Sequence, residues 1–162
     1  FDTPTPLANK PGRKDQVNFS FGPFQGTVKK WIGSGTLDLT NEKEVKAAAF
    51  QIQEAIFSHA LSKVKLTIEK NQDKLAGVTH LVASGGVASN FLLRSKLDSY
   101  LSQIGIETSY PPLELCTDNA VMIGWAGIEL YEKEKLTTDI GVVPISKWPI
   151  SEIMEVGGWK RD

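Results

Sequence analysis

Apolar side chains recur at helical spacing between residues 41 and 70, and this is the clearest periodic pattern in the chain. They stand three to four positions apart, which places them on one face of an α-helix. The positions are Val45, Ala49, Ile52, Ile56, Ala60, Val64 and Ile68. Asn41 and Glu44 form a capping pair ahead of the pattern. We therefore expect a long helix that runs from there to about Lys70.

A strand, a glycine-rich turn and another helix follow in the pattern. An apolar run predicts a buried strand over residues 79–84, and helical spacing predicts a helix near 87–103 that stops at Gly105. Residues 106–110 are typical of a strand, which the proline at Pro111 ends.

The last predicted helix runs from about residue 118 to residue 133 and contains small residues that allow close backbone packing. The order helix, strand, helix, strand, helix indicates the α/β class. Ligands of such folds bind beyond the carboxyl ends of the strands.

The two ends of the chain lack this periodicity. Residues 1–17 are rich in proline and predict a linker or extended segment. The aromatic pattern over 17–27 predicts a strand, a sharp turn and a returning strand. We expect one lobe over 18–133 and an irregular tail over 134–162, with a short helix around 150–155.

Composition narrows the function classes. With 162 residues, 41% hydrophobic and 23% charged, the chain fits one soluble globular domain or a large piece of a bigger one. The net charge of −1 gives no overall basic field for nucleic acid, and a single cysteine excludes an internal disulfide. No apolar run approaches the roughly 18 residues of a membrane span. Because the chain starts at Phe1, we expect it to be processed or truncated.

Two helix starts carry candidate chemistry. Residues 84–90 (Ser-Gly-Gly-Val-Ala-Ser-Asn) join a strand to a helix, and Gly85 and Gly86 let a ligand approach the backbone. Residues 116–122 (Cys-Thr-Asp-Asn-Ala-Val-Met) place the Asp118 carboxylate at a second helix start. Together they suggest a nucleotide and metal site. Taken alone, the glycine pair also fits a tight turn without a ligand, and the aspartate also fits a simple N-cap.

Three blocks of the sequence carry a family resemblance. Residues 84–90, 115–124 (Leu-Cys-Thr-Asp-Asn-Ala-Val-Met-Ile-Gly) and 18–21 (Asn-Phe-Ser-Phe) together resemble the universal tRNA N6-adenosine threonylcarbamoyltransferase family. That family was formerly called the O-sialoglycoprotein endopeptidase or glycoprotease family. Residues 144–149 (Pro-Ile-Ser-Lys-Trp-Pro) look like its mitochondrial and bacterial branch. The chain departs from the family at 22–27 (Gly-Pro-Phe-Gln-Gly-Thr), where Ser-Gly-Leu-Lys-Thr is usual.

The resemblance covers the C-terminal half of the family and implies both a fold and a reaction. The implied fold is α/β, the second lobe of the two-lobed actin-like ATPase and sugar-kinase (ribonuclease H-like) architecture. The implied reaction transfers threonylcarbamoyl from threonylcarbamoyl-adenylate to the N6 amine of the adenine next to the anticodon, in tRNAs that read codons starting with A. AMP leaves.

The resemblance also assigns substrate contacts. Gly85 and Gly86 match the contact with the adenosine of the donor, Ser89 and Asn90 match hydrogen bonds to a ribose or base edge, and Thr117 matches a contact to a phosphate or hydroxyl. The last three residues also fit plain helix caps. No side chain of the chain is an obvious general base, so we name no catalytic residue.

The family's metal carboxylate falls on Asp118. A hard carboxylate suits zinc or iron beside two imidazoles, which the family takes from a His-x-x-x-His helix in its N-terminal half. His59 and His80 do not stand in such a motif, and we expect each of them to be a packed or a surface residue. Cys116 reads as buried and inert. Without a Ser–His or Cys–His pair, the old peptidase name does not fit the chemistry.

Two other functions stay open at this point. The chain could be a non-catalytic dimerisation or scaffold lobe of the same family, or a lobe of an actin-like ATPase or sugar kinase. For the transferase, the implied partners are the N-terminal half of the same protein, tRNA and a second copy in a homodimer, without a membrane. The implied location is mitochondrial, with the bacterial cytoplasm as the alternative.

Overall fold

The computed structural model describes residues 1–7, 12, 15–143, 145–147 and 160–161. The chain divides into two compact units, Phe1–Cys116 and Thr117–Asp162, and each is described here by itself. Helices dominate both, and the first unit contains a small parallel sheet. The mixed α/β class that the element order predicted is therefore confirmed.

Helix α1 (Gly22–Gly33) occupies the segment in which we expected a strand, a turn and a returning strand, so that prediction is wrong. Pro23 stands in the first helical turn, where its missing N–H costs nothing and its fixed φ favours the helix. Phe24 and Trp31 are both buried, and their spacing of seven is that of a helix face. Phe19 is exposed instead of forming the inner face of a strand.

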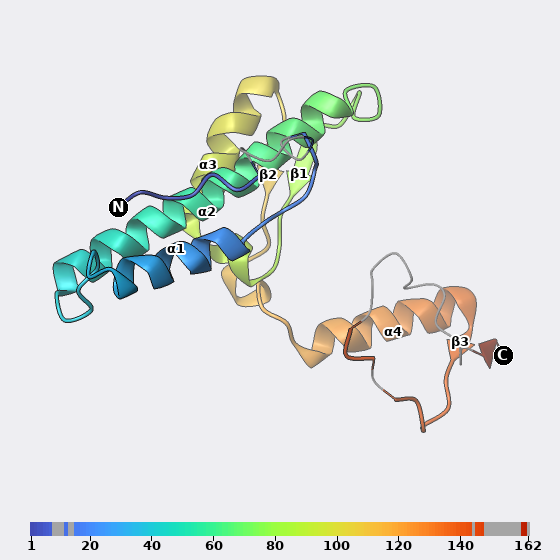
Figure 1. The fold of residues 1–162 in the computed structure, drawn as a ribbon. Helices are drawn as coiled ribbons and strands as arrows, with labels where there is room; N and C mark the ends of the chain where they lie inside the picture. The colour runs from blue at the N-terminus through green and yellow to red at the C-terminus, as the bar shows by residue number, and fades with distance from the viewer. Residues whose placement is uncertain (8–11, 13–14, 144, 148–159, 162) are drawn as a thin grey trace. The chain divides into compact units, whose positions relative to one another are not determined.

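Helix α2 (Glu42–Lys70) confirms the long helix predicted from the apolar periodicity. The Asn41 side chain caps it by accepting the Lys43 N–H, and its amide donates to the Glu44 carboxylate at 2.9 Å. Figure 1 shows α1 running alongside α2. A small hydrophobic core forms here from Trp31, Leu37 and Ala48, with Val28, Val45 and Ile52 packed against it.

The parallel sheet is built on a strand–helix–strand connection. Strand β1 (His80–Val82) pairs in parallel with strand β2 (Glu107–Ser109), and α3 (Phe91–Leu101) lies between them in the sequence. Helix α3 packs against α2 and β2, and its Leu97 and Leu101 are buried. Both predicted strands and the predicted helix are thus present, although each is shorter than the pattern suggested.

One face of this sheet is not covered by any of the described residues, which corrects the prediction of a buried strand. Leu81 is paired in register with Thr108, and Thr108 donates a hydrogen bond to Asp98 of α3. Helix α3 therefore covers the face that carries these two strand residues. Side chains alternate along a strand, so Val82 points to the opposite face, where it is 73% exposed.

The second unit contains helix α4 (Ala120–Glu134) and a short antiparallel pair, β3 (Leu136–Thr137) with β4 (Lys160–Arg161). The pair lies inside the tail that we expected to be irregular. Lys135 ends α4 in a left-handed conformation with φ of 52°. The short helix that we expected around residues 150–155 lies outside the described residues. None of the described helices combines the length and apolarity that crossing a membrane requires.

Candidate functional site

Residues 84–90, called here the glycine turn, join β1 to α3. Gly85 has φ of 93° and ψ of 168°, a conformation that is essentially restricted to glycine. A Cβ added to Gly85 would meet no described heavy atom within 4 Å. The glycine is therefore needed for its backbone angle, and the space beside it is open to an approaching ligand.

The polar side chains of the glycine turn are engaged within the protein. The Ser89 hydroxyl donates to the Gly86 carbonyl at 2.6 Å, which leaves its oxygen lone pairs to accept from a ligand. Asn90 caps α3 by accepting the Leu92 N–H at 3.0 Å, and its amide donates to Gln53 of α2 at 3.2 Å. The hydrogen bonds of Ser89 and Asn90 therefore stabilise the conformation of the glycine turn.

The segment after β2 lies against the glycine turn. A Cβ added to Gly86 would stand 3.7 Å from the Cys116 carbonyl oxygen. The Cys116 thiol is buried, at 2% exposure, and lies 3.5 Å from a guanidinium nitrogen of Arg94. The burial that the sequence suggested for this cysteine is confirmed. Sequence reasoning missed Arg94. Its position one helical turn after Asn90 was the one feature of the sequence that placed it near the glycine turn.

The aspartate that we matched to a metal ligand does not cap its helix. Helix α4 begins at Ala120, and its N-cap is Asn119, whose side chain accepts the Met122 N–H at 3.1 Å. Asp118 and Thr117 precede the cap and are exposed. The plain reading of Asp118 as an N-cap is therefore wrong, and capping does not occupy its carboxylate.

The described residues alone do not form a metal centre, because they contain no group of three or more His, Cys, Asp and Glu side chains that could hold an ion. His59 accepts the Ser20 N–H at its Nε2, and His80 contacts Thr79 and Glu107. Both histidines are engaged elsewhere. The chemistry of the Asp118 carboxylate suits one hard oxygen ligand of a zinc or iron ion, and such an ion would need further ligands from outside the described residues.

His59 lies among aromatic side chains. The rings of Phe19, Phe21 and Phe24 pack edge-on around it with centroid distances of 6.4, 5.8 and 6.2 Å. Burial, followed by the charge of Lys63, lowers the His59 pKa below its ordinary value. The neutral ring is therefore favoured, as its acceptor role requires.

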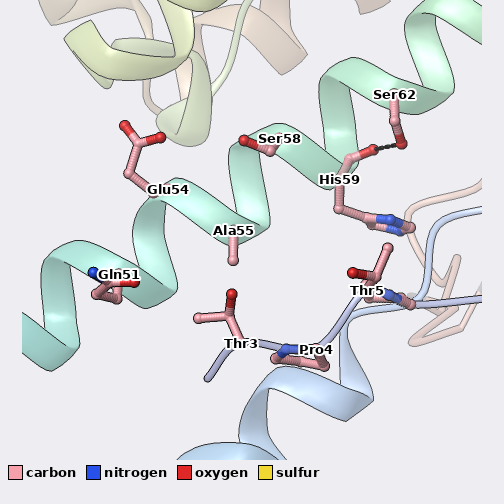
Figure 2. Close-up of a pocket in the computed structure, with 10 residues that line it drawn as sticks. Thr3, Pro4, Thr5, Gln51, Glu54, Ala55, Ser58, His59 and Ser62 are labelled. Atoms are coloured by element: carbon pink, nitrogen blue, oxygen red, sulfur yellow. Dashed lines mark hydrogen bonds between the residues drawn. The ribbon is translucent and has the colours of Figure 1, made fainter. Parts of the chain in front are cut away.

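A pocket of about 350 Å³ lies between α2 and the N-terminal segment (Figure 2). It is lined on one side by Thr3 and Thr5 and on the other by Ala55, Ser58 and His59. It contains no residue that the sequence assigned to substrate or metal, so the glycine turn remains the candidate site.

Comparison with known proteins gives the family. The model of the family described as tRNA N6-adenosine threonylcarbamoyltransferase matches residues 2–125. The mitochondrial tRNA N6-adenosine threonylcarbamoyltransferase of Schizosaccharomyces pombe is 36% identical over 96% of this chain and 38% of the relative. The tRNA N6-adenosine threonylcarbamoyltransferases of Anaplasma phagocytophilum and Ehrlichia chaffeensis are 32% and 33% identical, each over 94% of this chain and 43% and 42% of the relative. The chain spans about two fifths of the length of these relatives. It belongs to the tRNA N6-adenosine threonylcarbamoyltransferase family.

Proposed function

We propose that this chain supplies the C-terminal part of the site that transfers threonylcarbamoyl from threonylcarbamoyl-adenylate to the N6 amine of the adenine next to the tRNA anticodon. The observation that carries the proposal is the glycine turn in a chain of this family. Gly85 holds a conformation that only glycine adopts readily, with open space beside it, at the carboxyl end of a parallel strand.

In this proposal the backbone of the glycine turn receives the adenosine part of the donor. Gly85 and Gly86 allow close approach, since no side chain stands in the way. The Ser89 oxygen accepts a hydrogen bond from a ribose hydroxyl. Asn90 caps α3 and so fixes the start of this helix next to the glycine turn. Thr117, exposed and next to the buried Cys116, offers its hydroxyl to a phosphate or hydroxyl of the donor.

Asp118 is the metal ligand in this proposal, and two histidines of an N-terminal half complete the site with it. When bound, zinc or iron supplies Lewis-acid polarisation of the carbamate carbonyl or a phosphate oxygen. The rest of the rate comes from orientation of the weakly nucleophilic adenine amine against the donor. AMP is released as the new bond to N6 forms.

The architecture proposed for the complete protein is the two-lobed actin-like ATPase fold. Residues 18–133 form the C-terminal lobe, residues 1–17 lead into it and residues 134–162 follow it as a tail. The strand–helix–strand unit of β1, α3 and β2 supports this assignment. Similarity to a mitochondrial relative and to bacterial relatives supports a mitochondrial location or, alternatively, the bacterial cytoplasm. A homodimer is the active form in this proposal.

The proposal is tested with the protein that this chain forms together with its N-terminal half. Bound metal per protein and threonylcarbamoylation of tRNA are measured for the wild type, for Asp118→Ala and for Asp73→Ala. Asp73 is an exposed acid after α2 and serves as the control. We expect Asp118→Ala to abolish bound metal and activity while the protein stays folded, and Asp73→Ala to change neither. A wild-type protein that binds neither donor nor metal would instead be a scaffold lobe.

A further inference from the structure

Arg94 joins the two segments that follow the parallel strands. Its Nε donates to the Ala88 carbonyl of the glycine turn at 2.6 Å. An Nη2 of the same guanidinium lies 3.5 Å from the Sγ of Cys116, in the segment that follows β2. One side chain on α3 therefore contacts both segments at the carboxyl end of the sheet, which is where ligands of α/β folds bind.

The guanidinium is itself held in place. It lies over the Tyr110 ring, with 4.5 Å between its central carbon and the ring centroid. The Tyr110 hydroxyl donates to the Asp98 carboxylate of α3 at 2.7 Å. Burial, together with this bond, raises the pKa of Tyr110 to about 12, which is the direction expected for a hydroxyl that donates to a carboxylate. The ring therefore stays fixed beneath Arg94.

The backbone of the glycine turn lies close to the backbone of Cys116. Gly86 faces the Cys116 carbonyl oxygen, and an added Cβ would already be in van der Waals contact with it. Thr117 and Asp118 follow Cys116 directly in the sequence. If this separation changed, the backbone of the glycine turn would move relative to Cys116. It would then also move relative to the start of the segment that continues into Thr117 and Asp118.

We propose that Arg94 is a positioning residue that sets the distance between the glycine turn and the Cys116 segment. This role rests on the proposed function of the glycine turn as the adenylate site. In this role Arg94 acts through the Ala88 carbonyl and the Cys116 sulfur. The planar guanidinium can reach both at once, whereas a lysine has a single nitrogen with which to bridge them.

The test compares Arg94→Gln and Arg94→Lys with Lys96→Gln in the complete protein. Lys96 lies two positions along α3, and its ammonium group contacts α2, pairing with Glu54 at 2.7 Å and donating to the Ser58 hydroxyl at 3.4 Å. AMP affinity, the KM for the adenylate donor, the KM for tRNA and the melting temperature are measured for each variant.

We expect both Arg94 variants to weaken AMP binding and to raise the donor KM by roughly tenfold, because a charge-assisted hydrogen bond is lost. The KM for tRNA stays unchanged, and Lys96→Gln behaves as the wild type. A purely structural role would lower the melting temperature and the active fraction and leave the donor KM as it was. Arg94→Lys keeps the charge over Tyr110, so it reports on positioning even where Arg94→Gln folds poorly.

Two results would overturn the proposal, and they have different meanings. An unchanged donor KM and AMP affinity in a folded Arg94→Lys variant would remove the positioning role and leave the proposed function standing. A wild-type protein without affinity for AMP or the donor would overturn the proposed function, and the positioning role with it.

Discussion

Gly86 lies directly against the backbone of Cys116, so that a Cβ on the glycine would stand 3.7 Å from the cysteine carbonyl oxygen. The two glycines of the turn therefore have different physical reasons to be glycine. Gly85 is required by its backbone angle, while Gly86 stands at an ordinary contact distance from its neighbour. Substitution by alanine separates the two.

Gly85→Ala is expected to destabilise the protein by about 1–3 kcal/mol, since its φ of 93° is strained for any residue with a Cβ. Gly86→Ala places its methyl group at van der Waals distance and is expected to cost less than about 1 kcal/mol. Urea unfolding followed by circular dichroism measures both. Equal losses for the two variants would show that the backbone angle at Gly85 is not the decisive feature.

Substitution by alanine is expected to change stability at Asn119 but not at Asp118. Asn119 caps α4, so Asn119→Ala is expected to lower stability by about 1 kcal/mol. Asp118 accepts none of the helix's N–H groups in this cap, so Asp118→Ala is expected to leave the unfolding midpoint within error of the wild type. Thermal unfolding without added metal makes the comparison. A loss for Asp118→Ala as large as that for Asn119→Ala would restore the capping role to Asp118.

Much of the fold could be predicted because its signals are local. The helical spacing that starts near Val45 predicted α2 and its cap at Asn41, and the pattern after the glycine break predicted α3, although α3 begins at Phe91 and not near residue 87. The segment from Gly22 to Gly33 could not be read in the same way. The aromatic residues over 17–27 suggested two strands around a turn. The helix face becomes visible only in the structure, where Phe24 and Trp31 are both buried.

The residues of the candidate site also differ in whether their roles have a local signal in the sequence. Gly85, which needs a particular backbone angle, stands out in the sequence because glycine is the residue that adopts that angle. The role of Arg94 cannot be read from the sequence, since its partners Ala88 and Cys116 come from two different segments. The distinction between Asp118 and Asn119 as the cap of α4 turned on a shift of one residue, which is finer than sequence patterns resolve.

Asn90 combines a cap with a link to α2, and the two contributions can be separated. Asn90→Ala removes both the bond to the Leu92 N–H and the bond to Gln53, and is expected to cost about 1–2 kcal/mol. Asn90→Asp keeps an acceptor at the helix start and adds a favourable charge there, so we expect stability near that of the wild type. Urea unfolding of both variants, with Gln53→Ala as the control for the link, measures these effects.

The same Asn90→Asp variant also tests the assignment of Asn90 to the donor site. A carboxylate beside a phosphate-bearing donor would repel it, so the affinity for AMP is expected to fall although the protein remains stable. An unchanged AMP affinity in this variant would mean that Asn90 has only its structural roles, the cap of α3 and the link to Gln53.

The contact between His59 and Ser20 predicts a pH-dependent stability. The Ser20 N–H donates to the neutral His59 ring at 3.1 Å, and a protonated ring could not accept it. The folded pKa is lowered by burial and by Lys63, so the unfolded chain binds the proton more readily. Stability from this contact is therefore complete above the unfolded pKa of 6.5 and decreases as the pH falls below it toward the folded pKa.

Urea midpoints at about pH 7.5 and pH 5.5, on either side of the ordinary histidine pKa, measure this dependence. We expect the wild type to lose stability at the lower pH. His59→Gln offers an uncharged acceptor at all pH values, so its decrease is expected to be smaller. His80, which is exposed and lies beside Glu107, provides the matched control, and His80→Gln is expected to show a decrease at least as large as that of the wild type. Equal pH dependence in the wild type and in His59→Gln would show that another group carries the effect.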